Sequence, residues 1–160
     1  MDDLQRKILN LQGPILVLGA SGFVGANLMR TLLRYRSDVF GTCSKLPAWR
    51  LDGLPEENVV LCDLMVPANI EVLLDRTRPL TIFDCVSYGA YSFQNDVDLI
   101  YRTNVNVAVN LMQRCVVKLY LVLLCKFVQK TKFFYVKKGL LKLVLLTLQL
   151  TQLRLVLSTV

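Results

Sequence analysis

Three glycines stand at the spacing of a turn that can hold a phosphate group. Gly19, Gly22 and Gly25 follow the apolar run at residues 14–18 and open a stretch with helical periodicity. In such a turn the first glycine allows a sharp bend, the second lets an anion approach the backbone, and the third lets the helix pack closely on the strand. We therefore predict a pyrophosphate site at the helix N-terminus, with a purely structural tight turn as the alternative. The residues predicted to form the site are Gly19, Ser21, Gly22, Phe23, Val24 and Gly25.

The elements around this turn alternate between strands and helices. Apolar runs predict strands at residues 14–19, 38–43, 58–62 and 80–86. Amphipathic spacing predicts helices at residues 23–36, 67–77 and 95–115, with a loop at 44–57. Strands that alternate with helices in this way indicate an α/β fold with a parallel sheet of βαβ units. The glycine turn then follows the first strand, at the sheet edge where ligands bind.

The end of the second predicted strand bears on the choice of dinucleotide. An NAD site places an acid about 20 residues beyond the glycine turn, where it holds the ribose diol. No carboxylate stands there, and Ser44 and Lys45 follow the strand instead. A hydroxyl and an ammonium group can bind a 2′-phosphate, so NADP is slightly favoured over NAD. Arg50 is a further candidate, and a solvated loop charge is the alternative for Lys45.

The segment 13–115 resembles the N-terminal half of an extended short-chain dehydrogenase/reductase of the NAD-dependent epimerase/dehydratase family. The glycines of residues 19–25 are spaced G-x-x-G-x-x-G, and residues 21–25 match the first-turn pattern of that family. Residues 81–87 stand in the place of its fourth strand. Asp84 departs from the His or similar residue often found there. The resemblance implies a Rossmann-type doubly wound sheet, NAD or NADP as cofactor, a nucleotide-sugar substrate and a homodimer.

The resemblance also assigns roles outside the turn. Asp63 and Leu64 resemble the acid-Leu pair whose carboxylate bonds the adenine amine, whereas Asp63 as a simple turn former is the alternative. Val86 and Ser87 stand at the end of the strand that passes beside the cofactor, and for Ser87 and Tyr88 ordinary loop residues are the alternative. Asn104 belongs to a Thr-Asn-Val element like that of the family, or it is a hydrogen-bonded core residue that steadies a neighbouring strand.

The catalytic set of this family is absent from the sequence. Its members use a Tyr with a Lys four residues later, and a Ser upstream, for proton transfer. None of the six tyrosines has a Lys at that position, and no Ser stands between Ser92 and Ser158. Tyr135 comes nearest, but Lys137 and Lys138 follow it at spacings that face another side of a helix. We therefore predict no catalytic residue and an inactive chain.

The absence of His also excludes His bases and His-ligated metal sites, and no metal site is predicted.

The composition changes after Cys115. Residues 1–115 carry eleven Lys and Arg against twelve Asp and Glu, whereas residues 116–160 carry eight Lys and Arg and no acid. This tail also holds fourteen Leu and eight Val, with no Pro or Asn. A shifted reading frame of the same gene is the simplest account, and divergence, splicing or a membrane-docking tail are alternatives. We expect a truncated, incomplete Rossmann domain over 13–115 and an aberrant Leu/Val/Lys-rich tail over 116–160.

If the tail is foreign to the fold, the fourth strand is left as an uncovered edge, and the tail either pairs with it or promotes aggregation.

The leading hypothesis is an NAD(P)-binding part of a nucleotide-sugar epimerase/dehydratase-type oxidoreductase. The alternative is a non-catalytic dinucleotide-binding module whose basic tail contacts a membrane or an acidic partner. A nucleic-acid partner is not expected, because the basic residues lack aromatic interleaving. The five scattered cysteines and the polar start predict a reducing cytoplasm and no secretory signal.

Overall fold

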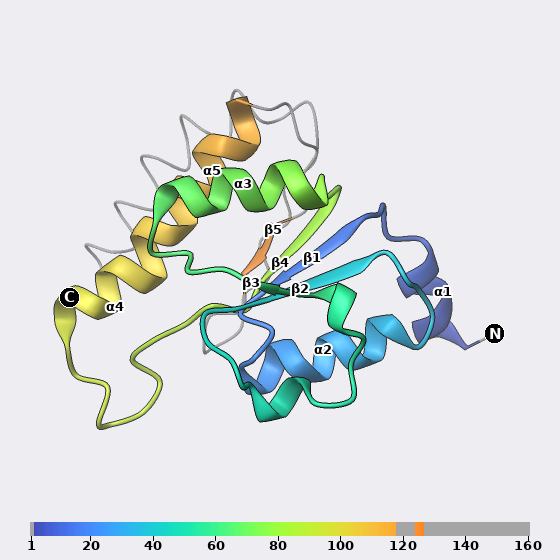
Figure 1. The fold of residues 1–160 in the computed structure, drawn as a ribbon, viewed down its shortest axis with the longest axis horizontal. Coiled ribbons are helices and arrows are strands. Elements are labelled where there is room, and N and C mark those ends of the chain that lie inside the picture. Colours follow the sequence, from blue (N-terminus) through green and yellow to red (C-terminus); the bar gives the residue numbers. More distant parts are fainter. Residues whose placement is uncertain (1, 118–123, 127–160) are drawn as a thin grey trace.

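A parallel sheet forms the centre of the fold (Figure 1). The computed structural model describes residues 2–117 and 124–126. Its sheet has five strands in the order β3-β2-β1-β4-β5. This order is that of a Rossmann-type doubly wound sheet, so the fold predicted from the sequence is confirmed. The strands are β1 (Ile15–Leu18), β2 (Val39–Cys43), β3 (Val59–Leu61), β4 (Thr81–Asp84) and β5 (Leu124–Lys126).

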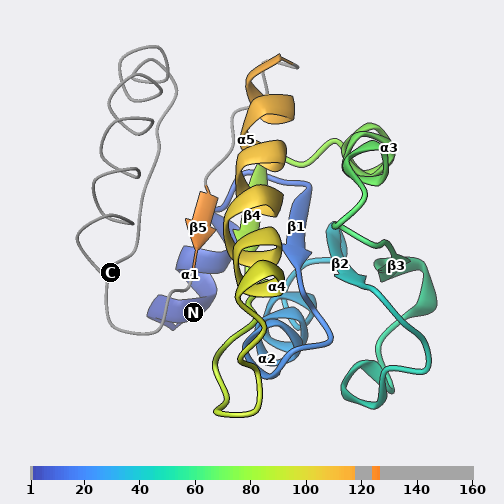
Figure 2. The same ribbon diagram turned by 90° about the vertical axis from the view of Figure 1, so that its left-hand side faces the viewer.

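Helices cover both faces of this sheet. In Figures 1 and 2, α1 and α2 lie on one face, and α3 lies with α4 and α5 on the other. Their bounds are α1 (Asp3–Leu9), α2 (Phe23–Leu33), α3 (Pro67–Thr77), α4 (Val97–Tyr101) and α5 (Val107–Val117). The shorter turns are η1 (Trp49–Leu51), η2 (Glu56–Asn58) and the π-helical turn η3 (Arg102–Asn106).

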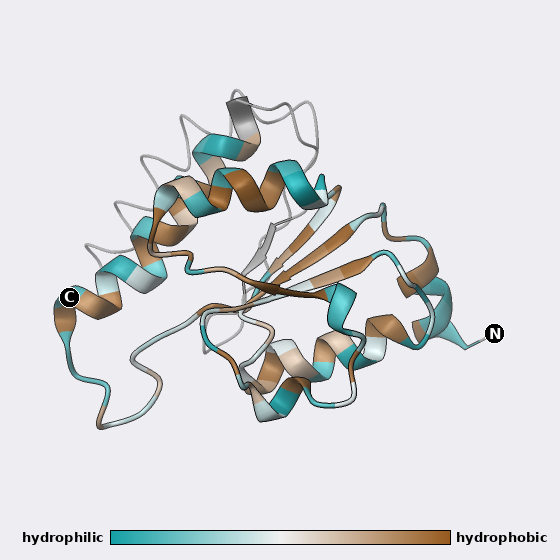
Figure 3. Cartoon of the chain, viewed as in Figure 1, coloured by the Kyte–Doolittle hydropathy of each residue, from teal (hydrophilic) through white to brown (hydrophobic). Residues whose placement is uncertain are grey.

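Strand β1 is buried on both faces, which explains why its sequence is continuously apolar. Leu16 and Leu18 belong to the core cluster under α3 and α5, whereas Ile15 and Val17 belong to the cluster under α2. All four side chains are fully buried. Figure 3 shows the apolar strands between helices whose outer faces are more hydrophilic. The two faces together hold β1, and therefore the turn that follows it, in a fixed place.

The long helix predicted at residues 95–115 is interrupted. Its first part, α4, is joined to α5 by the π-helical turn η3. A π-helical turn contains more residues than an α-helical turn, so it shifts the side chains that follow relative to those before it. Leu111 and Cys115 of the predicted apolar stripe are buried, but Tyr101 is 43% exposed. The stripe is therefore correct beyond η3, whereas Tyr101 before η3 lies at the surface.

The tail supplies one strand to the sheet. Strand β5 runs parallel to β4, with Ile82 opposite Leu124 and Asp84 opposite Lys126. Of the two outcomes that the sequence leaves open for the fourth strand, pairing is thus observed over these residues. The other predictions for the tail fall on residues outside those described.

Candidate cofactor-binding site

The glycine turn after β1 has the geometry that its sequence predicts. Gly19 has a φ of 69°, a left-handed conformation that glycine adopts without strain. The Gly22 amide donates to the Gly19 carbonyl at 3.0 Å, which closes the turn. A Cβ on Gly19 would stand 3.1 Å from the backbone of Cys85 and Val86. The turn therefore passes directly against the chain that leaves β4.

Gly25 brings α2 close to this turn. A Cβ on Gly25 would stand 2.8 Å from the Cα of Ala20 and still closer to the Gly19 carbonyl oxygen. Gly22 differs, because its φ is −74° and a Cβ there would meet only the Gly19 oxygen, at 3.2 Å. The third glycine is thus required for packing, while the second leaves the backbone open to a ligand.

The first turn of α2 is open to an anion. Gly22 is its N-cap, and no side chain caps the helix. The Ala26 amide donates to the Gly22 carbonyl at 2.9 Å, so the preceding amides of the first turn have no intrahelical acceptor. Phe23 and Val24 are 72% and 39% exposed, which leaves this helix end accessible. Together with the macrodipole, these amides fit the pyrophosphate of a dinucleotide.

Thr42 is an anchor of the turn that the sequence reasoning missed. Its hydroxyl oxygen accepts from the Gly19 amide at 3.1 Å, and its carbonyl accepts from the Ala20 amide at 2.8 Å. The Thr42 side chain is buried at the end of β2. Two strands therefore hold the glycine turn. The only sequence signal for this contact is a polar residue in an otherwise apolar strand.

The predicted residues that follow β2 and β4 lie at the same edge of the sheet as the turn, because all the strands are parallel. Ser44 and Lys45 are exposed directly after β2, and Ser87, which follows Val86 beyond the end of β4, is exposed as well. The Val86 amide donates to the Asp84 carboxylate at 3.0 Å, which fixes the chain beside the glycine turn.

Asp63 acts locally as a turn former. Its carboxylate accepts from the Met65 amide at 2.9 Å, and its carbonyl accepts from the Asn69 side chain at 3.0 Å. The Asp63 residue is nevertheless exposed, so a carboxylate oxygen can still meet a ligand amine. The Leu64 side chain belongs to the core cluster under α3. A ligand would therefore meet Leu64 through its backbone.

Asn104 clamps the chain that leaves β4. Its side-chain oxygen accepts from the Tyr88 amide at 3.0 Å, and its amide nitrogen donates to the Tyr88 carbonyl at 2.7 Å. Asn104 is thus hydrogen-bonded as its second interpretation expects, although its partner lies beyond the end of β4, and its role toward a cofactor stays a prediction. Because Tyr88 follows Ser87, this clamp also orients the predicted cofactor-facing chain.

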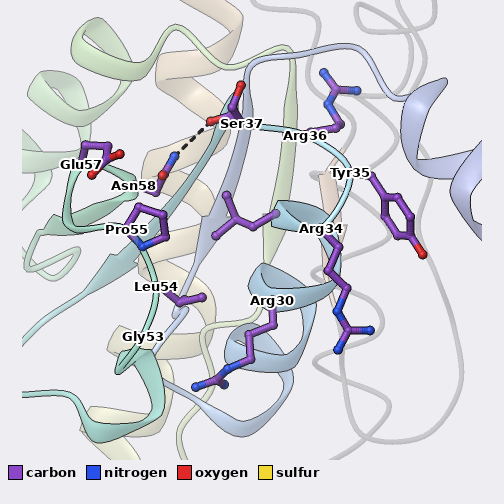
Figure 4. Close-up of a pocket in the computed structure, with 11 residues that line it drawn as sticks. Arg30, Arg34, Tyr35, Arg36, Ser37, Gly53, Leu54, Pro55, Glu57 and Asn58 are labelled. Atoms are coloured by element: carbon purple, nitrogen blue, oxygen red, sulfur yellow. Dashed lines mark hydrogen bonds between the residues drawn. The ribbon is translucent and has the colours of Figure 1, made fainter.

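A separate surface pocket of about 660 Å³ lies at the other edge of the sheet (Figure 4). Arg30, Arg34 and Arg36 line it together with Asn58, whose side chain donates to the Ser37 carbonyl at 3.1 Å. These residues precede β2 and β3, whereas the glycine turn follows β1. The pocket is therefore not part of the predicted cofactor site.

Cys43, Cys62 and Cys115 are buried, whereas Cys85 is half-buried. Burial raises the pKa of the Cys115 thiol to about 12, and it also raises the pKa of Cys43 and Cys62. A thiol with a raised pKa is a poor nucleophile at neutral pH. Cys43 and Cys62 belong to clusters on opposite faces of the sheet.

Within residues 2–117 and 124–126, no three His, Cys, Asp or Glu side chains gather as a metal site would require. In the same residues, no helix has both the length and the apolar character needed to cross a bilayer.

The sequence model of the NAD dependent epimerase/dehydratase family matches residues 15–129. The chain therefore belongs to this family, whose members use NAD. No curated protein sequence matches the chain significantly.

Solved structures with the same fold come from several oxidoreductases and epimerases. L-threonine 3-dehydrogenase from Trypanosoma brucei has a TM-score of 0.63 and 18% identity, over 84% of this chain and 47% of that one. The Bordetella bronchiseptica enzyme WbmG in complex with NAD and UDP has a TM-score of 0.61 and 20% identity, over 74% and 38%. UDP-glucose 4-epimerase from Thermus thermophilus, in complex with NAD, has a TM-score of 0.55 and 21% identity, over 66% of this chain and 34% of that one. The chain thus spans less than half the length of these proteins.

Proposed function

We propose that this chain is the NAD(P)-binding part of a nucleotide-sugar epimerase/dehydratase-type oxidoreductase and is inactive in catalysis by itself. The observation that carries the proposal is the glycine turn. Its positive-φ Gly19, its tightly packed Gly25 and the uncapped start of α2 together leave room for a pyrophosphate. When bound, the cofactor supplies the hydride acceptor and donor.

The chain's own residues bind and orient in this proposal. The first turn of α2 holds the pyrophosphate, Asp63 faces the adenine amine, and the segment with Val86 and Ser87 lies beside the nicotinamide end. The sequence has no Tyr-x-x-x-Lys pair and no Ser between Ser92 and Ser158, which supports inactivity because family members move the proton with these groups. A nucleotide-sugar substrate and a homodimer follow from the family resemblance and belong to the same proposal.

The cofactor proposal is tested by calorimetric titration of the full chain with NAD⁺ and NADP⁺. We compare wild type with Gly22→Ala, because the backbone at Gly22 has an ordinary φ and the new methyl group meets only one oxygen. The variant should fold, yet its methyl group should obstruct the pyrophosphate and weaken binding at least about tenfold. Val72→Ala, an exposed change on α3, is the matched control and should bind as wild type does. Equal binding by wild type and Gly22→Ala would remove the proposal.

A second candidate rests on the charge of residues 116–160, which carry eight basic residues and no acid. It is a non-catalytic dinucleotide-binding module whose tail contacts an anionic membrane or acidic partner. The full chain should then bind vesicles that contain anionic lipid, and should release them as salt increases. Equal binding to neutral vesicles, or no binding, contradicts this candidate.

The free cysteines of the described residues support a reducing, cytoplasmic location for either candidate.

A further inference from the structure

Strand β2 carries a glycine, Gly41, directly beside the glycine turn. A Cβ on Gly41 would stand 2.7 Å from the Cβ of Ala20 and 2.8 Å from the sulfur of Met29. Ala20 belongs to the turn and Met29 to α2, so the missing side chain lets both lie against the strand. A glycine inside a strand weakens it and often marks such a close approach. Strand β2 is therefore shaped to receive the turn.

The next residue of β2, Thr42, holds the backbone that Gly41 admits. Its hydroxyl oxygen accepts from the Gly19 amide at 3.1 Å, and its carbonyl accepts from the Ala20 amide at 2.8 Å. Thr42 is 1% exposed, so solvent does not compete for its hydroxyl oxygen. A backbone amide that loses its acceptor inside a protein is costly. The Gly19 amide thus depends on a single buried side chain.

The position of Gly19 determines where α2 begins. On the side of β4, a Cβ on Gly19 would stand 3.1 Å from the backbone of Cys85 and Val86. Gly19 is therefore held between the ends of β2 and β4, at a φ of 69°. Its carbonyl accepts from the amide of Gly22, the N-cap of α2, at 3.0 Å. A displacement of Gly19 would consequently turn the first amides of α2 away from a bound anion.

We propose that Thr42 is a positioning residue for the dinucleotide, because its hydroxyl holds Gly19 so that the first turn of α2 receives the pyrophosphate. The inference rests on the proposed function, since it concerns the same cofactor site. A site that is ordered before binding loses less conformational freedom when the ligand arrives. NAD and NADP share the pyrophosphate, so the Thr42 hydroxyl contributes equally to the binding of both.

The test measures the dissociation constants of NAD⁺ and NADP⁺ for the full chain by calorimetry. Thr42→Val exchanges the hydroxyl for a methyl group and keeps a β-branched side chain in the strand. It should weaken the binding of both dinucleotides about 3- to 10-fold, because the Gly19 amide loses its acceptor. Thr42→Ser keeps the hydroxyl and should bind both within about twofold of wild type.

Thr81→Val is the matched control. Thr81 is also a buried strand residue, and its hydroxyl donates to the Gln12 carbonyl at 2.6 Å, at the start of β4 and far from the glycine turn. Thr81→Val should lower the urea midpoint of unfolding as Thr42→Val does, but leave both affinities within about twofold of wild type. The comparison separates a role in positioning from a general loss of stability.

The outcomes distinguish this inference from the proposed function. If wild type binds neither dinucleotide, the proposed function fails and the inference fails with it. If wild type binds and Thr42→Val binds equally well, only the inference is overturned. The same holds if Thr42→Val and Thr81→Val weaken binding by the same factor.

A measurement on wild type decides the question even if Thr42→Val does not fold. Hydrogen exchange followed by NMR should show the Gly19 and Ala20 amides protected before any dinucleotide is added. Titration with NAD⁺ should then shift the amide resonances of Phe23 and Val24 and leave the protection of Gly19 and Ala20 unchanged. If the Gly19 and Ala20 amides become protected only after the dinucleotide binds, the turn is not held in advance and the inference is wrong.

Discussion

An added methyl group at Gly25 has no room, because the backbone of Gly19 and Ala20 stands where it would lie. Alanine would favour the helix by about 1 kcal/mol over glycine, but the collision involves backbone that cannot rotate away. We expect Gly25→Ala to lower the free energy of unfolding by about 1–3 kcal/mol, as overpacking does elsewhere. Urea unfolding measures this loss. Gly22→Ala is the comparison, and a smaller loss at Gly25 than at Gly22 would contradict the packing argument.

Asn104 satisfies both backbone groups of Tyr88 with one side chain. Asn104→Ala leaves that amide and carbonyl without this partner, so we expect a loss of about 1–3 kcal/mol in the free energy of unfolding. Cofactor affinity should fall as well, because the chain beside the glycine turn loses its clamp. Asn106→Ala is the matched control, since Asn106 is exposed in the same turn η3. Equal losses in the two variants would show that the clamp has no special role.

At the scale of elements, Arg36 joins helix α1 to the start of β2. Its guanidinium donates to the carbonyls of Ile8 in α1 and Leu11 just beyond it, and to both carboxylate oxygens of Asp38 at 2.8 and 2.7 Å. We expect Arg36→Leu to speed hydrogen exchange of the α1 amides, while Arg34→Leu, next to it in the pocket lining, does not. Equal exchange in the two variants would contradict this role.

The same contact predicts a dependence of stability on pH. The hydrogen bond from Arg36 holds the pKa of Asp38 below its ordinary value. A lowered folded pKa means that the stabilisation is present above the unfolded value, about 3.9, and is lost as pH falls through the folded pKa. Because the Asp38 side chain is 41% exposed, the contribution is below about 1 kcal/mol. The stability difference between wild type and Arg36→Leu should therefore narrow below about pH 4 in urea unfolding. A difference that widens there would contradict the assignment.

The elements that the sequence predicts correctly are those with a strong local pattern. The apolar run of β1 and the proline-started α3 can be read from neighbouring residues alone. Contacts between distant segments cannot be read in this way, which is why the sequence does not reveal Thr42 as the partner of Gly19. The sequence does not predict the π-helical turn η3 either, because an amphipathic pattern of residues does not indicate where a turn contains one additional residue.

At the scale of the whole molecule, the candidate site is assembled entirely from the first four strands and the segments that follow them. The glycine turn, Lys45, Asp63 and Ser87 come from four different parts of the chain, and the parallel strand order β3-β2-β1-β4 brings them to one edge. Although the chain spans less than half the length of the solved structures that it matches, the described part contains every residue proposed to hold the cofactor.

Cofactor binding should therefore stabilise the fold as a unit. A ligand that binds only the folded state at one hundred times its dissociation constant adds about 2.7 kcal/mol to the free energy of unfolding. We expect NAD⁺ or NADP⁺ at that excess to raise the melting temperature of the full chain by several degrees. A tenfold weaker affinity leaves about half of this stabilisation, so the Gly22→Ala variant should show a shift at most about half as large at the same concentration. The same samples, supplied with a nucleotide sugar, should show no turnover, because the sequence lacks the Tyr-Lys pair and its Ser. A melting shift of equal size in Gly22→Ala would place the dinucleotide elsewhere, and measurable turnover would show that another group moves the proton.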